Sequence, residues 1–242
     1  MKSEKTEQIT ITAGSRRIPA TLHWRDRRTL GLSVAPGCKV EVYAPKRAER
    51  CEVENFLQKK AAWMARKLEE QKKYHPLPRP KQYISGESLT FLGRQYRLKV
   101  MPGKKVNAAK EGQYLLITVP GDNNNGTVKK AVENWYRQRA KEVFAEKLTD
   151  GMEIAARHGI NTEPELRIRR MKRRWGSCDA RGKIILNTNL VQAPMHSVEY
   201  VIMHELCHLK EIKHDRAFYS LLSRCLPDWA QRKEELNRMI IC

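Results

Sequence analysis

The sequence predicts an α+β fold, built from two strand-and-helix units and a compact C-terminal domain. Three observations predict it. Segments rich in β-forming residues precede a long helix-period segment in residues 1–80, the same order recurs in 81–160, and residues 161–242 begin with two short strands followed by apolar helices. The chain of 242 residues is long enough for one large domain or two small ones. These three ranges are the predicted units.

The first unit is expected to hold several strands and one helix. The segments with alternating or β-rich patterns are 9–12, 18–24, 30–34 and 39–45. A helix is expected near 48–73, because apolar residues recur there at helical spacing. They are Val53, Leu57, Ala61, Met64 and Leu68.

The second unit repeats this order after a proline-rich connection at 74–88. Strands are expected at 88–93, 96–101 and 113–120, and a helix near 127–158. In each unit a proline at the end of the last strand, Pro45 or Pro120, stands eight residues before a valine of the helix. Two interpretations are open: a duplicated unit, or two ordinary strand-to-helix transitions.

The C-terminal region begins with two predicted strands, 165–178 and 183–190. They are joined by "DARG", in which Gly182 suits a turn. A helix is then expected from about 195 to 212. Another follows Asp215, which is a suitable N-cap, and a last helix follows "LPDW".

Composition suggests a cytoplasmic protein with a strong positive charge. No run approaches the roughly 18 apolar residues of a membrane span, and the N-terminal residues lack the apolar core of a secretory signal. The six cysteines contain no CxxC pair, so free thiols are expected. The net charge of +20 predicts contact with a polyanion such as nucleic acid or a nucleotide, although a solvated basic surface would give the same charge.

The segment "HELCH", residues 204–208, predicts a metal site. Residues four apart on a helix lie about 40° apart around its axis, so His204 and His208 face the same way. Glu205 is turned about 100° from His204, which places it beside the ion rather than on it. This is the HExxH arrangement of zincins, in which the glutamate acts as general base. Cys207 points in the wrong direction for a ligand and is expected to be a small buried residue.

The third ligand has three candidates. His214 is favoured, and the alternatives are Glu211 and a glutamate of a following helix. In an unbroken helix His214 would lie about 15 Å from His204, so the chain must turn after Leu209. No Gly or Pro marks that turn. Three protein ligands would leave a coordination position open, as catalytic zinc sites require.

Four blocks of the C-terminal region together resemble the YgjP-like metallopeptidase family, which is similar to the SprT-like and minigluzincin zinc proteases. The blocks are "RMKRRWGSC" (170–178), "ILNTNL" (185–190), "YVIMHELCHL" (200–209) and "KHDRAFY" (213–219). The resemblance implies a zincin-like domain with Zn²⁺ on His204, His208 and His214, and a catalytic Glu205. The family usually reads Asn-His-Ser around the third ligand, where this chain has Lys-His-Asp.

These residues predict a zinc-dependent peptidase with a polypeptide substrate. Arg173 or Arg174 is a candidate for contact with the substrate or the developing oxyanion, and the strand around 166–175 is expected to flank the cleft. One alternative is a nucleoside triphosphate pyrophosphatase, an activity that has been attributed within the family. Another is a nucleic-acid-binding module, or a protease recruited to DNA as SprT-like enzymes are.

Overall fold

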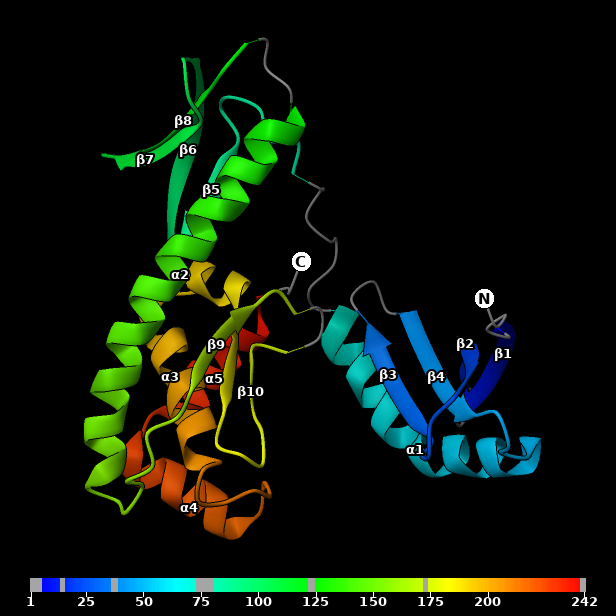
Figure 1. The fold of residues 1–242 in the computed structure, drawn as a ribbon. Coiled ribbons are helices and arrows are strands. Elements are labelled where there is room, and N and C mark those ends of the chain that lie inside the picture. The colour runs from blue at the N-terminus through cyan, green and yellow to red at the C-terminus, as the bar shows by residue number, and fades with distance from the viewer. Residues whose placement is uncertain are drawn as a thin grey trace. The chain divides into compact units, whose positions relative to one another are not determined.

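The computed structural model describes residues 6–13, 16–35, 39–72, 81–121, 125–171 and 174–239. The chain divides into two compact units, Met1–Arg79 and Pro80–Cys242. Both combine helices with small sheets, so the predicted α+β class is confirmed (Figure 1). Within the described residues, no helix has both the length and the apolar character that a membrane crossing requires.

The first unit is a four-stranded sheet with one helix packed on it. Its strands are β1 (Thr6–Ala13), β2 (Arg16–Arg25), β3 (Gly31–Ala35) and β4 (Lys39–Pro45), in the order β1-β2-β4-β3. Helix α1 (Arg50–Lys72) supplies the other half of a closed core. Alternate residues of β2 and β4, such as Leu22 and Val42, are buried in this core together with Met64 of α1.

The second unit opens with a sheet of the same plan. Its strands are β5 (Ser88–Phe91), β6 (Arg94–Pro102), β7 (Asn107–Glu111) and β8 (Tyr114–Val119), in the order β5-β6-β8-β7, followed by α2 (Asn125–Ala156). Strand β7 was not predicted, because "NAAKE" contains neither β-branched nor aromatic residues. It forms because it pairs with β8 along its whole length.

The two sheets match in pairing direction as well as in strand order. In each, the second and fourth strands of the unit run parallel, and both outer pairs are antiparallel. Val53 and Val128, the two valines at equal distance from a proline, are both buried against their sheet. This agreement favours the duplication over two unrelated strand-to-helix transitions.

The rest of the second unit carries the predicted metal site. It contains β9 (Leu166–Arg169), β10 (Gly176–Cys178), β11 (Ile184–Asn187), the 3₁₀ helix Thr188–Gln192, α3 (Met195–Cys207), α4 (Arg216–Cys225) and α5 (Trp229–Asn237). The single strand expected at 165–178 is two strands. β9 pairs parallel with β11, whereas β10 pairs antiparallel with the other side of β11.

Helix α2 joins the sheet to the helices of the metal site. In Figure 1 the sheet lies along the first half of α2, and α3 lies beside its second half. Gly151 allows this close approach, since a Cβ there would lie 3.0 Å from Leu206 Cδ1 of α3. Residues 81–160 and 161–239 therefore share one hydrophobic core, which includes Phe144 of α2 and Leu206 of α3. The division of this region into two units at residue 160 stays a prediction.

Candidate metal centre

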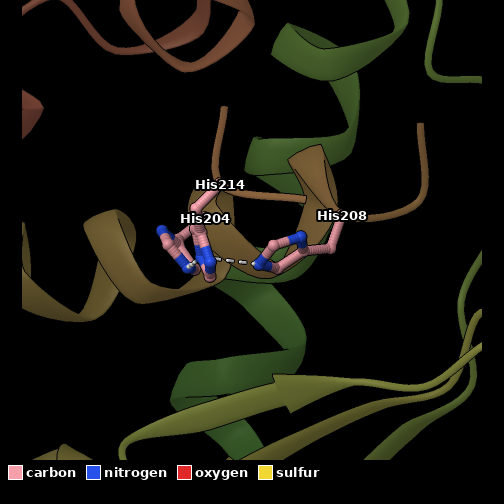
Figure 2. A group of neighbouring side chains, drawn as sticks. All are labelled: His204, His208 and His214. Atoms are coloured by element: carbon pink, nitrogen blue, oxygen red, sulfur yellow. Dashed lines mark hydrogen bonds between the residues drawn. The ribbon is translucent and has the colours of Figure 1, made fainter. Parts of the chain in front are cut away.

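Three histidine side chains converge at the end of α3 (Figure 2). The Nε2 atom of His214 lies 2.9 Å from Nε2 of His204 and 3.0 Å from Nε2 of His208. One ligand atom from each residue lies within 4.8 Å of the other two. The structure thus brings together the three residues that the sequence favoured as metal ligands.

A turn directly after α3 brings His214 back to the helix. The helix ends at Cys207 rather than near 212 as expected, and His208 is its C-cap. The N–H groups of Leu209 and Glu211 then donate to the carbonyls of Leu206 and Cys207, at 3.0 and 2.9 Å. Cys207 itself is buried, as expected.

Contacts on both sides fix this turn. The Nζ atom of Lys210 donates to the carbonyl of His158, 3.1 Å away, just beyond the end of α2. On the other side, the Asp215 carboxylate accepts from the N–H groups of Ala217 and Phe218, at 3.0 and 3.2 Å. Asp215 is therefore confirmed as the N-cap of α4, and it holds the residue next to His214 in place.

Glu211 contributes to the site through its backbone. Its carbonyl accepts a hydrogen bond from Nδ1 of His208 at 2.9 Å. This bond puts the proton on Nδ1 and leaves the Nε2 lone pair of His208 free for an ion, a common arrangement of metal-binding histidines. The described part of the chain holds a single group of three or more potential ligands, and no glutamate belongs to it.

Two of the three imidazoles, those of His204 and His214, favour the neutral form that binds metals. Burial lowers the pKa of His204 to about 3, and the neighbouring His208, His214 and Lys233 act in the same direction. Burial likewise lowers the pKa of His214. Three imidazole nitrogens are a donor set that suits Zn²⁺, and also Cu, Ni and Fe. The residues therefore fit a transition-metal ion.

Phe218 is the common packing partner of the three rings. Its ring centroid lies 4.9, 4.6 and 4.8 Å from those of His204, His208 and His214, and its side chain is fully buried. Nδ1 of His204 is buried and has no hydrogen-bond partner within the described ranges, so packing against Phe218 and Tyr200 orients that ring. The sequence analysis missed Phe218. The signal was an apolar residue in the first turn of the helix after His214.

Glu205 lies beside the histidines and faces β10. Its side chain is 5% exposed, and a Cβ on Gly176 would lie only 2.6 Å from its Oε1 atom. Burial raises the pKa of Glu205 to about 7, against the opposite effects of the Arg174 charge and the backbone N–H of Cys178. The carboxylate thus lies in a tight slot between α3 and β10.

A cleft of about 680 Å³ contains this centre. One side carries the three histidines and Glu205, and the other carries β10 and the turn 179–182. The strand beside the cleft is β10 and not residues 166–169, because β9 lies at the opposite edge of its sheet. Arg174 lines the cleft, whereas Arg173 lies outside the described residues.

Asn187 holds the segment that leads into β10. It is fully buried, and its amide donates to the carbonyls of Met171 and Arg174, at 2.8 and 2.9 Å. Its Oδ1 atom accepts from the N–H groups of Met171 and Asn189, both at 3.2 Å. Sequence reasoning gave this residue no role, because all but one of its partners lie in a segment 13–16 residues away.

Replacing Asn187 by Ala should lower the free energy of unfolding of the second unit by about 2–4 kcal/mol, because buried backbone groups lose their partners. Thermal unfolding followed by circular dichroism would measure this. Asn134→Ala, at an exposed position of α2, is the control and should change stability by less than about 0.5 kcal/mol. Equal stability of the two variants would contradict the role given to Asn187.

Replacing Gly176 by Ala should move the Glu205 carboxylate out of its slot, because the new methyl carbon would lie 2.6 Å from Glu205 Oε1, 2.9 Å from its Cγ and 3.0 Å from Val201 Cγ1. The melting temperature should fall as well, because Val201 is buried in α3. A crystal structure and thermal unfolding of the variant would measure the two effects. An unmoved Glu205 carboxylate together with wild-type stability would contradict the tight contact between α3 and β10.

Similarity to known proteins identifies the family of this chain. A search of curated proteins found no match. Among solved structures, the metallopeptidase zymogen of Pyrococcus abyssi abylysin is 22% identical, with a TM-score of 0.34, over 39% of this chain and 90% of that chain. The model of the family described as "YgjP-like, metallopeptidase domain" matches residues 28–239. The chain therefore belongs to the YgjP-like metallopeptidase family.

Proposed function

We propose that this protein is a zinc-dependent peptidase of the zincin type, with His204, His208 and His214 as metal ligands and Glu205 as general base. The observation that carries the proposal is the convergence of three imidazole nitrogens within 4.8 Å, in a cleft that also contains a buried carboxylate. Three protein ligands leave a coordination position open, as in catalytic rather than structural zinc sites. When bound, zinc would acidify a water molecule and polarise the substrate carbonyl.

Two observations support Glu205 as the general base. Its carboxylate does not belong to the ligand group, yet it is the next residue after His204 on α3 and lines the same cleft. As general base it would take a proton from the attacking water and then deliver it to the leaving amine nitrogen. The narrow slot against Gly176 limits the positions that the carboxylate can occupy, which favours a fixed direction of proton transfer.

Arg174 is the candidate for stabilising negative charge in the transition state. It lines the cleft, and its charge acts on Glu205. Asn187 holds the carbonyl of Arg174, which fixes the backbone from which this side chain extends. A guanidinium there can donate hydrogen bonds to a developing oxyanion. The same role for Arg173 stays a prediction from the sequence.

Strand β10 offers an edge to which an extended polypeptide can add. Strand β10 pairs with β11 on one side, and it is an edge strand of the described sheet. Its backbone lines the cleft next to Glu205. A substrate strand adding to this edge would bring a peptide carbonyl past the histidines, and backbone hydrogen bonds of this kind bind peptides with little sequence dependence.

Hydrolysis of nucleoside triphosphates is the second candidate. The observation in its favour is that Arg174 and Arg181 both line the cleft, where they can pair with phosphates. Against it, the Asp179 carboxylate, the other acid of the cleft lining, accepts the N–H groups of Arg181 and Lys183 at 2.9 and 3.0 Å. It is therefore engaged in the turn rather than free for magnesium. Contact with nucleic acid and a cytoplasmic location stay predictions from the sequence.

One product assay separates the two activities. Zinc-loaded protein and protein treated with a chelator would each be incubated with an unfolded polypeptide and nucleoside triphosphates, with and without DNA. Mass spectrometry should detect new peptides in the zinc-loaded sample alone. Pyrophosphate and nucleoside monophosphate in place of peptides would overturn the peptidase proposal and support the second candidate. Faster proteolysis with DNA would support recruitment to nucleic acid.

A further inference from the structure

Ile212 is an unusually exposed apolar residue at the cleft. Its exposed fraction is 80%, compared with 46% for Ile84, 50% for Val106 and 37% for Tyr114, the other large apolar residues that are exposed within the described ranges. A single exposed apolar side chain needs no explanation by itself. Ile212, however, stands in the loop between the ligands His208 and His214 and lines the cleft.

Other side chains that carry methyl groups line the same cleft as Ile212. Leu209 lies in the same loop, and Thr162, Ala180 and Gly182 line the cleft as well. A Cβ on Gly182 would lie 3.4 Å from Leu209 Cδ2 and 3.9 Å from Thr162 Cγ2, so the turn and these two side chains are adjacent. We call Thr162, Ala180, Leu209 and Ile212 the apolar subsite.

Backbone hydrogen bonds close the turn that carries Ala180. The N–H of Asp179 donates to the carbonyl of Lys183, and the N–H of Gly182 donates to the carbonyl of Asp179, both at 3.0 Å. Gly182 has a φ of +77°, a conformation that glycine adopts without strain. A turn held by its own hydrogen bonds loses little conformational entropy when a ligand packs against it, which favours binding.

The subsite lies within reach of a substrate bound at the metal centre. Gly176 of β10 touches Glu205, and the turn begins three residues later at Asp179, a span of roughly 10 Å along a strand. Leu209 directly follows the ligand His208. A side chain entering the subsite would therefore belong to a residue within about three positions of the scissile bond.

We propose that the apolar subsite makes the enzyme select peptides with a large aliphatic or aromatic side chain within three residues of the cleaved bond. This inference rests on the proposed peptidase function and adds the substrate class. Such side chains are buried in folded proteins, so the substrates would be unfolded or unassembled polypeptides. Loss of a good apolar contact changes discrimination by about 10- to 100-fold.

The test compares matched peptides that carry Leu or Ser at each position within three residues of the cleaved bond. We expect wild-type kcat/KM to be at least about 10-fold higher for Leu at one of these positions. Ile212→Ser should reduce that preference to about threefold or less. Ile84→Ser, an equally apolar exposed residue outside the cleft lining, is the control and should keep the full preference.

Binding by the zinc-loaded Glu205→Gln protein tests the inference separately from cleavage. Fluorescence anisotropy with the same peptides should show tighter binding of the Leu peptide, and adding Ile212→Ser should remove the difference. Absence of cleavage by wild type together with this binding pattern would refute the peptidase function and keep the apolar subsite. Equal affinity for the Leu and Ser peptides, or a preference that survives Ile212→Ser, would overturn the subsite.

Discussion

Replacing Glu205 by Gln should lower kcat by about 10²- to 10⁴-fold while the protein keeps its metal, because the variant lacks the carboxylate that we propose as general base. Gln has nearly the same shape as Glu, so it fits the slot against Gly176. Glu205 does not belong to the group of three histidines that could hold the ion. Steady-state kinetics and metal analysis of the same preparation would measure both parts of the prediction.

Glu211→Gln is the matched control for this variant. Glu211 stands in the loop between His208 and His214, but its hydrogen bond with His208 involves its backbone carbonyl. We therefore expect Glu211→Gln to keep both the metal and the wild-type kcat. Full activity of Glu205→Gln would refute its role as base, and loss of metal from Glu211→Gln would restore Glu211 as a ligand.

Replacing His214 by Ala should weaken zinc binding by more than about 100-fold. Changes to groups that merely orient a ligand already weaken binding by about 10- to 100-fold, and we propose that His214 supplies a ligand atom itself. The residue is exposed and lies outside the helices, so the fold should persist without it. Competition with a chromogenic chelator would give the two affinities.

Thermal stability gives a second measure of the loss of zinc affinity in His214→Ala. An ion bound only by the folded state, at a free concentration 100 times its Kd, adds about 2.7 kcal/mol to the free energy of unfolding. For a unit of this size, that should raise the melting temperature by about 5–10 °C. Zinc should produce this rise in wild type and a much smaller one in His214→Ala. The same rise in both would show that His214 is not a ligand.

Helix spacing and helix capping predicted the site residues whose positions depend only on their neighbours in the sequence. His204, Glu205 and His208 are placed by helical spacing, and Asp215 is placed by its capping chemistry. The end of α3 was predicted too late, because no Gly or Pro marks it. What holds the turn is the bond from Lys210 to the carbonyl of His158, 52 residues earlier, and no local pattern records such a contact.

The sequence analysis missed other residues for the same reason, because their roles depend on contacts with residues elsewhere in the chain. Gly176 matters because Glu205 packs against it, and Phe218 matters because three histidine rings meet on it. Neither relation can be read from spacing along one element. Strand β7 has an unremarkable composition and forms through its partner β8. Contacts between residues that are far apart in the sequence therefore explain the features that the sequence analysis did not predict.

The two copies of the sheet-and-helix plan should respond differently to mutations that create a cavity in their helix. The core cluster of the first copy is made of described residues between Ile11 and Met64. The core of the second copy extends through α2 into α3, where His204 lies. A cavity made in α2 should therefore loosen the helix that carries His204, whereas a cavity made in α1 affects a core cluster that includes no residue of the metal centre. The two copies share one strand order but should tolerate mutation unequally. The copy whose core includes residues of α3 should tolerate it less.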